Sequence, residues 1–193
     1  MRFIMQPLIF YPLAIVVAAG IILFGLEPQR LPRDPRPVAG EVQGQALVLG
    51  PAAFDAPSPS PDQHLTVMRD FWGRPLTLRI AVLPDQPEPT PAERGVRILL
   101  SPEAAARVTD TPVTVEVSYN PLNINTATGL AVSLQGIAPA DWVIQEIAAQ
   151  PGVVSFTLPA QMAVDAIGFR AISSNNDQAY GVEITNVRVL PQS

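Results

Sequence analysis

Alternation of apolar and polar positions dominates the chain from Gln63 onward. In the segment 76–82 apolar side chains occupy every second position, and the segments 113–119 and 130–134 repeat the pattern. A period of two sends successive side chains to opposite faces, so these segments are predicted to be half-buried β-strands. Pro, Gly and Asn turns separate further predicted strands at 96–100, 142–147, 153–158, 163–171 and 181–190. Eight or nine short strands predict a mainly β fold, an antiparallel β-sandwich.

Two local signals refine this prediction. The apolar positions change phase between Ile184 and Val187, which predicts a β-bulge near Thr185–Asn186. The one competing helix is the segment 102–108, where a proline at the first helical position follows Ser101 as N-cap. We therefore expect one short helix of about two turns within an otherwise β domain.

The N-terminal pattern is different, because no charged residue occurs from Phe3 to Leu26. Twenty-four residues at ~1.5 Å each give a helix of about 36 Å, enough to cross a hydrocarbon core of ~30 Å. A cleaved signal peptide has a shorter apolar region and a small-x-small site, which is absent before Glu27. The sequence predicts a retained transmembrane helix over residues 1–26.

Small residues in this run offer a helix-packing face. Ala14 and Ala18 have the small-xxx-small spacing that permits close helix approach, and Ala19 and Gly20 adjoin them. The alternative is the ordinary Ala and Gly content of a membrane span. The run has no His, Asp or Glu, so we expect it neither to ligate a haem or chlorophyll through imidazole nor to relay protons.

Residues 27–61 are rich in proline, with Pro28, Pro32, Pro35, Pro37, Pro51, Pro57, Pro59 and Pro61. Such a segment favours polyproline II, so it is predicted to be a semi-rigid spacer between the span and a sandwich over 62–193. A first strand is possible in the segment 41–49. Arg30, Arg33 and Arg36 are candidate contacts to a partner. The proline-rich loop 84–93 is either a contact element or a solvated spacer.

Charge sets the expected orientation. Arg2 precedes the apolar run and three arginines follow it, so the positive-inside signal is nearly balanced. Long domains are translocated across the membrane largely regardless of their charge. The region from Val38 onward has 8 arginines against 15 acids, an excess of negative charge. We expect a single-pass protein of the cell inner membrane with its C-terminal domain in the periplasm.

Composition excludes several classes of function. The net charge of −5 argues against nucleic-acid binding, which requires a basic patch. With no cysteine and one histidine, His64, the chain lacks the ligands for a structural zinc, iron–sulfur or c-type haem site. We therefore expect no metal and no cofactor. His64 follows a proline-rich loop without a Gly-x-Ser-x-Gly turn, and no Gly-rich phosphate loop occurs, so no catalytic residue is assigned and no enzyme is expected.

The order of the later strands carries a resemblance. The segments 95–100, 113–117, 152–158 and 166–170, followed by the long segment 180–189, resemble the galactose-binding-like jelly roll that many carbohydrate-binding modules share. The resemblance covers about residues 40–190 and is clearest in the terminal hairpin. It implies sugar binding by aromatic rings and hydrogen-bonding side chains, for which the candidates are Trp72, Trp142, Tyr180 and Asn175. It also implies a weaker possibility of calcium bound through Asp177 or Glu183.

Two functions remain open. The first is a non-catalytic accessory subunit of a larger membrane complex, photosynthetic or respiratory, which braces other membrane subunits and lipid through its span, linker and periplasmic domain. The alternative is a membrane-anchored carbohydrate-binding module with a sugar ligand. Exposed aromatic residues on one sheet face would favour the second function, whereas burial of the small-residue face and the linker against other chains would favour the first.

Overall fold

The computed structural model describes residues 7–25, 33–84, 95–137, 141–173 and 178–192. The chain forms two compact units, residues 1–31 and residues 32–193.

The first unit contains one helix, α1 (Pro7–Gly25), of 19 residues. Pro7 suits the first helical turn because its missing N–H would lack an intrahelical partner there. Apolar side chains are exposed around the circumference of α1, among them Leu13, Ile15, Val16, Val17 and Ile21. The sequence prediction of an apolar helix is thus confirmed.

The predicted membrane crossing is not supported. Among the described residues, no helix has both the length and the apolar character that a membrane span requires. The 24-residue run that suggested a span corresponds to a described helix of 19 residues, which extends only about 28 Å.

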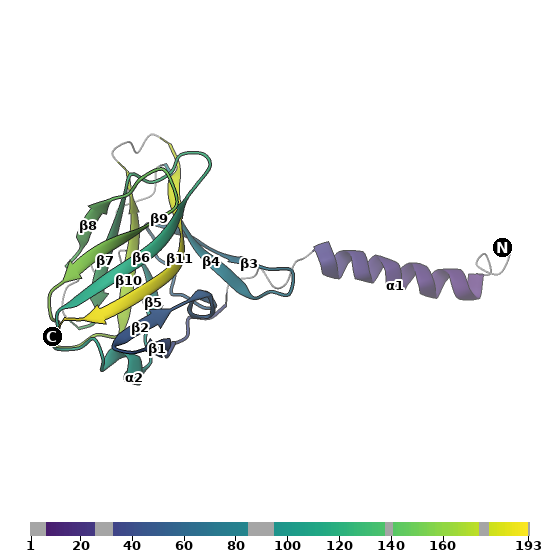
Figure 1. Ribbon diagram of the computed structural model, residues 1–193. Coiled ribbons are helices and arrows are strands. Elements are labelled where there is room, and N and C mark those ends of the chain that lie inside the picture. The colour runs from purple at the N-terminus through teal and green to yellow at the C-terminus, as the bar shows by residue number, and fades with distance from the viewer. Residues whose placement is uncertain (1–6, 26–32, 85–94, 138–140, 174–177, 193) are drawn as a thin grey trace. The chain divides into compact units, whose positions relative to one another are not determined.

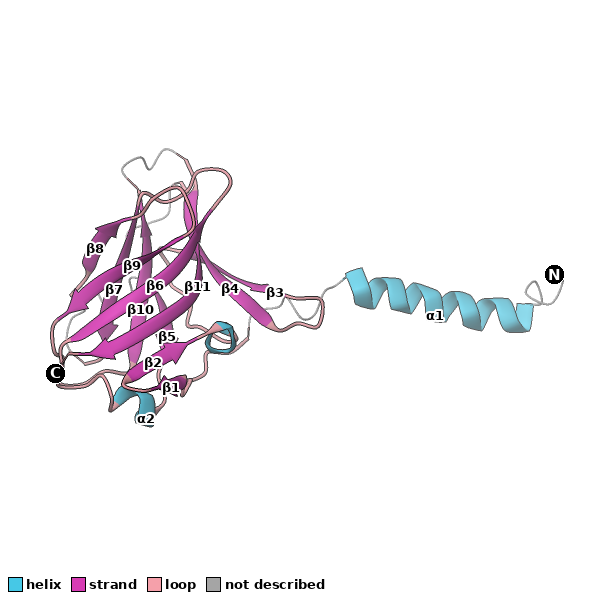
Figure 2. Cartoon of the chain, in the orientation of Figure 1, coloured by secondary structure: helices cyan, strands magenta, loops and turns pink. Residues whose placement is uncertain are grey.

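The second unit is mainly β and has two sheets in which the named strands pair antiparallel (Figures 1 and 2). The strands of the seven-stranded sheet are β1 (Glu41–Gln43), β2 (Ala46–Leu49), β3 (His64–Arg69), β4 (Pro75–Val82), β6 (Val113–Pro121), β9 (Gly152–Leu158) and β11 (Tyr180–Pro191). The strands of the four-stranded sheet, in spatial order, are β5 (Val96–Leu99), β10 (Ala166–Ile172), β7 (Gly129–Gln135) and β8 (Val143–Glu146). These pairings confirm the predicted antiparallel β-sandwich.

Strand β11 organises the larger sheet. Along one edge it pairs with β6, which pairs in turn with β9. Along its other edge it pairs with β4 over residues 180–184 and with β2 over residues 187–189. Between these two segments the register with β6 shifts from Ile184 to Asn186, so the bulge predicted from the change of phase is confirmed.

The core lies between the two sheets. In β6 the apolar residues at alternate positions are buried, and in β7 all seven residues are buried. The largest buried rings are Phe54, Phe156 and Phe169. Removing an apolar side chain of this kind from water contributes about 1.5–3 kcal/mol. The alternation in the sequence is therefore the source of the main folding force.

The predicted helix is present and shorter than expected. Helix α2 (Pro102–Ala105) has four residues, and the Ser101 hydroxyl accepts a hydrogen bond from the Ala104 N–H as predicted for an N-cap. A 3-10 turn follows β2 at Pro51–Phe54 and buries Phe54. Strand β3 was not identified as a separate strand from the sequence. The predicted loop 84–93 lies outside the described residues from position 85 on.

The proline-rich segment differs from the predicted spacer. Strands β1 and β2 form a hairpin, and β2 joins the larger sheet through β11. The Val38 N–H donates to the Leu99 carbonyl, and the backbones of Ser58 and Arg97 exchange two hydrogen bonds. From Arg33 onward the segment is therefore part of the sandwich. Its prolines interrupt the strands without preventing these isolated backbone pairings.

Candidate functional site

Arg170 is the one charged residue of strand β10. Its neighbours Phe169 and Ala171 belong to the core. Because side chains alternate along a strand, Arg170 points to the outer face of the four-stranded sheet. The side chain is 22% exposed, so it is not fully buried.

Asp62 holds this guanidinium in place. Arg170 Nε donates to Asp62 Oδ2 over 3.1 Å, and the Asp62 side chain is 8% exposed. Asp62 Oδ1 accepts from the Gly95 N–H over 3.0 Å and also from the Ser60 hydroxyl. Among the described residues the two Nη atoms of Arg170 have no hydrogen-bond partner. Four of the five N–H donors of the guanidinium are therefore oriented but unused.

Trp142 packs against the same guanidinium. The Arg170 Cζ atom lies 5.5 Å from the centroid of the indole, within the range of a cation–π contact. The ring also reaches Gly95, where an added Cβ would lie 2.4 Å from Cη2 of Trp142. Gly95 has φ +83°, a conformation that favours glycine. Glycine thus serves both the backbone conformation and the close approach of the indole.

The Gln63 side chain hydrogen-bonds the backbone of β10 beyond the end of β5. Strand β5 pairs with β10 only as far as Val96 opposite Phe169. Beyond that pair, the Ala171 N–H donates to Gln63 Oε1 over 2.9 Å, and Gln63 Nε2 donates to the Ala171 carbonyl over 3.2 Å. The Gln63 amide therefore replaces the missing strand. It fixes the segment that carries Asp62 against β10.

Tyr180, the first residue of β11, lies within electrostatic reach of Arg170 and Asp62. Burial raises the pKa of the Tyr180 hydroxyl, while the positive charge of Arg170 and a hydrogen bond with the Ser173 backbone oppose the rise. The negative charge of Asp62 adds a smaller upward contribution to the same pKa. Of the predicted sugar-binding residues, Trp142 thus contacts Arg170 directly, and Tyr180 is close enough for the charges of Arg170 and Asp62 to influence its pKa. We call Asp62, Trp142, Arg170 and Tyr180 the aromatic–arginine cluster.

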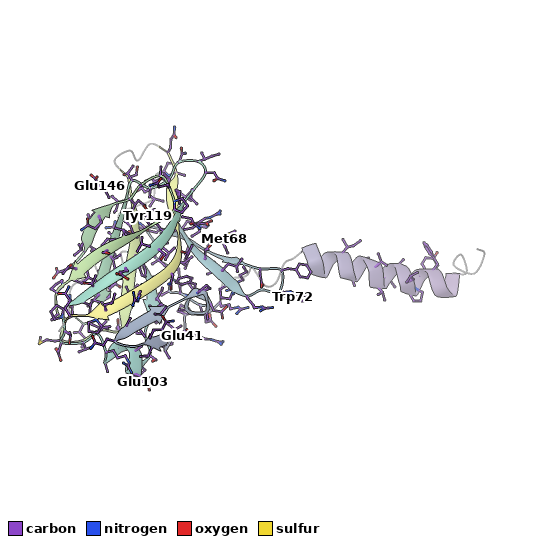
Figure 3. All side chains as sticks on the ribbon, viewed as in Figure 1. Glu41, Met68, Trp72, Glu103, Tyr119 and Glu146 are labelled. Atoms are coloured by element: carbon purple, nitrogen blue, oxygen red, sulfur yellow. The ribbon has the colours of Figure 1, made fainter. Side chains whose placement is uncertain are left out.

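Trp72 belongs to a different place. It lies in the turn between β3 and β4 (Figure 3), and Tyr180 pairs with Val82 at the opposite end of β4. From Pro75 to Val82 a strand rises about 23 Å at ~3.3 Å per residue. The indole of Trp72 therefore cannot share a ligand site with the cluster. We call the turn residues Asp70–Arg74 the hairpin tip.

The remaining sequence candidates do not converge on a site. Ala14, Ala18 and Ala19 are exposed, and a Cβ added at Gly20 meets no atom within 4 Å. Arg30 and Asn175 lie outside the described residues.

Two of the candidate linker arginines bond within their own unit. Arg33 Nη1 pairs with Asp55 Oδ1 at 2.5 Å, and the Arg36 N–H donates to the Ala56 carbonyl. His64 is exposed at the start of β3. The part of the chain that the structure describes holds no group of three or more His, Cys, Asp or Glu suited to a metal ion.

Sequence reasoning did not select Arg170 or Asp62. A signal was present for Arg170, because it is the single charge in the apolar strand 166–172. No comparable signal marks Asp62, since it follows a proline-rich loop in which acids are expected to be solvated. Its role depends on a tertiary contact 108 residues away in the sequence.

Comparison with solved structures finds chains with partial structural similarity. One is "BiXyn10A CBM1 APO", with a TM-score of 0.44 and 8% identity, covering 71% of this chain and 88% of that chain. Another is the insecticidal crystal protein Cry7Ca1 of Bacillus thuringiensis, with a TM-score of 0.42 and 14% identity over 82% of this chain and 24% of that chain.

A third is the CBM22-1-GH10 part of Xyn10B, an endo-1,4-beta-D-xylanase of Clostridium thermocellum, complexed with xylohexaose. It has a TM-score of 0.38 and 14% identity over 83% of this chain and 29% of that chain. No protein-family model and no curated protein matches the sequence.

Proposed function

We propose that the β-sandwich is a non-catalytic carbohydrate-binding module with its ligand site at the aromatic–arginine cluster. The observation that carries this proposal is the Arg170 guanidinium, which Asp62 orients and Trp142 flanks, while its Nη donors have no partner among the described residues. The jelly-roll topology expected from the sequence and the predicted periplasmic location are parts of this proposal.

The chemistry of the cluster suits a sugar. A pyranose presents apolar C–H faces together with hydroxyl groups, so it requires aromatic surface next to fixed hydrogen-bond donors. Trp142 and Tyr180 supply the rings, and Arg170 supplies donors whose direction is already set. Because these donors are held before the ligand arrives, little conformational entropy is lost on binding.

The charge of the cluster favours a neutral ligand. Asp62 neutralises Arg170 through the 3.1 Å ion pair, so the pair has no net charge. A phosphate or nucleic acid would require an excess of positive charge, whereas the whole chain has a net charge of −5. Hydroxyl groups gain hydrogen bonds from the guanidinium without having to break the pair with Asp62.

A buried donor next to the guanidinium adds support. The Nε1–H of Trp142 is buried and has no hydrogen-bond partner among the residues that the structure describes. Such a donor costs about 1–3 kcal/mol when left unsatisfied. A ligand hydroxyl that accepts from Nε1 after a small rotation of the indole would recover that free energy.

The accessory-subunit function loses one of its supports. Burial of the proline-rich linker against other chains would have favoured it. From Arg33 onward the structure instead packs this segment on its own sandwich, where β2 pairs with β11. No described residue therefore needs a partner chain to explain its order.

The proposal is tested by affinity electrophoresis of the full-length chain through gels that contain a panel of soluble neutral and acidic polysaccharides. We expect retardation by at least one neutral polysaccharide and its loss in Trp142→Ala. Trp72→Ala is the matched control, because it removes the same side chain at the hairpin tip and is expected to leave retardation unchanged. Circular dichroism of each variant checks that the sandwich is folded.

The outcomes separate clearly. Retardation that disappears in the folded Trp142→Ala variant and persists in Trp72→Ala supports the cluster as the site. Retardation lost only in Trp72→Ala would move the site to the hairpin tip. A folded wild-type chain that no polysaccharide retards would overturn the proposal.

A further inference from the structure

We propose that the hairpin tip, Asp70–Arg74, inserts its two aromatic side chains into the interfacial layer of a lipid bilayer that contains anionic headgroups. This proposal is independent of sugar binding, because its residues lie at the opposite end of β4 from Tyr180.

The first observation is the exposure of the tip. Trp72 is 74% exposed and the adjacent Phe71 is 67% exposed. Their ring centroids lie 5.2 Å apart at an interplanar angle of 84°, an edge-to-face pair that forms one contiguous apolar surface. Tryptophan is enriched at membrane–water interfaces because its ring combines an apolar body with a polar N–H.

The second observation is that the turn is rigid. The Asp70 carboxylate accepts from the Trp72 N–H over 2.9 Å and from the Arg74 N–H over 2.8 Å. The backbones of Asp70 and Arg74 are also hydrogen-bonded, and the Gly73 N–H donates to the Asp70 carbonyl. The aromatic pair is therefore displayed by a preformed turn, so its insertion costs little ordering of the backbone.

The base of the hairpin is equally fixed. The Arg69 side chain is 3% exposed, and its Nη1 donates to Asp55 Oδ1 over 2.6 Å. The same guanidinium also donates to the backbone carbonyls of Asp55 and Gly73. These hydrogen bonds of Arg69 connect the hairpin to the segment that carries Asp55.

The third observation is the local charge. The carboxylate of Asp70 is neutralised by Arg74, and that of Asp55 is shared by Arg33 and Arg69. Three arginines against two aspartates leave one positive charge at this end of a chain whose net charge is −5. The Arg74 side chain is 75% exposed and pairs with Asp70 through Nε at 3.5 Å. An anionic headgroup would therefore meet it as a second partner beside Asp70.

Insertion of a two-residue tip needs no membrane-crossing helix. The proposal therefore rests on the hairpin tip of the sandwich alone.

The test uses the full-length chain with Trp142→Phe, in which Trp72 is the single tryptophan. Fluorescence is recorded with phosphatidylcholine vesicles, with and without phosphatidylserine, and with brominated acyl chains as quenchers. We expect the Trp72 emission to shift to shorter wavelength and to be quenched by the brominated lipid, more strongly when phosphatidylserine is present. The matched control is Trp72→Phe, in which Trp142 reports and is expected not to be quenched.

Three results would contradict the proposal. The first is that the chain does not bind vesicles, and the second is that it floats with the vesicles while the Trp72 emission stays unchanged. The third is that Trp142 in the Trp72→Phe chain is quenched as strongly as Trp72. If Trp142→Phe does not fold, the wild-type signal minus that of Trp72→Phe isolates the Trp72 contribution. A Trp72 emission shift that requires an added protein rather than lipid would instead assign the tip to a protein partner.

Discussion

The two tryptophans of this chain lie in opposite environments. Trp142 is half-buried in the aromatic–arginine cluster, where residues from four separate segments meet. Trp72 is 74% exposed in a turn held by bonds among five consecutive residues. The comparison shows two ways to fix an aromatic side chain, one through tertiary contacts and one through local hydrogen bonds. Changes to the tertiary network should therefore affect the whole domain, whereas changes at the tip should affect only its contacts.

The largest effect is expected from Gly95→Ala. The new methyl would lie 2.4 Å from the Trp142 ring and 2.9 Å from Cγ of Arg170, and φ at this position is +83°. We expect a loss of about 3 kcal/mol or more in the free energy of unfolding, measured with urea, because overpacking adds to backbone strain.

Gly44→Ala is the matched control for this change. Its φ is +64°, but an added Cβ meets nothing within 4 Å. Gly44→Ala should lower the free energy of unfolding by about 1–2 kcal/mol, the cost of placing alanine at a positive φ. Equal losses in the two variants would show that the contact between Gly95 and Trp142 does not constrain the cluster.

Replacing each tryptophan by alanine compares their contributions to the free energy of unfolding. Trp142→Ala removes the ring that packs on Gly95 and Arg170, so we expect a loss of about 2–3 kcal/mol, below the 3–5 kcal/mol of a fully buried ring. Trp72→Ala removes an exposed ring and should change the free energy of unfolding by less than about 0.5 kcal/mol. A loss in Trp72→Ala as large as that in Trp142→Ala would contradict the contrast between them.

A smaller effect is expected at the base of the hairpin. Asp55→Asn leaves the buried Arg69 without its carboxylate, although two backbone carbonyls still accept from it. Because the Asp55 side chain is about a third exposed, we expect a loss of about 1–2 kcal/mol rather than the 3–5 kcal/mol of a fully buried pair. Chemical denaturation of both proteins at neutral pH measures it.

The effect of Asp55→Asn should also depend on pH. Burial by itself would raise the pKa of Asp55, but hydrogen bonds from Arg69 and Arg33 and their charges leave it lowered. A lowered folded-state pKa gives stability that is present above the unfolded value of ~3.9 and is lost as the pH falls through the folded value. The difference between wild type and Asp55→Asn should therefore shrink below about pH 4. A difference that stays constant down to pH 2 would contradict this assignment.

The local patterns in the sequence predicted much of the sandwich. The change of phase after Ile184 located the bulge, and the Ser101-Pro102 pair located α2. In the proline-rich segment, the possible strand in 41–49 corresponds to β1 and β2. The backbone pairings at Val38 and Ser58 were not predicted, because no side-chain periodicity reveals them. The apolar run predicted a helix correctly, but its composition alone did not predict the length of the described helix.

The candidate site was harder to predict than the fold. Trp142 and Tyr180 were selected as aromatic residues, but their convergence on Arg170 depends on the register of β10 against its neighbours. Asp62 reaches Arg170 across 108 residues of sequence. Residue type therefore indicated the kind of chemistry, and only the tertiary fold showed which residues meet and that Trp72 lies elsewhere.

The most direct test of the proposed sugar site is a fluorescence titration of the full-length Trp72→Phe variant with oligosaccharides of the polysaccharide that retards the chain. Trp142 is then the single tryptophan and lies in the cluster itself. We expect a saturable change in Trp142 emission, and we expect Arg170→Met to weaken the affinity at least tenfold, equivalent to about 1.4 kcal/mol. Saturable binding measured by calorimetry without any change in Trp142 emission, and with unaltered affinity in Arg170→Met, would contradict it.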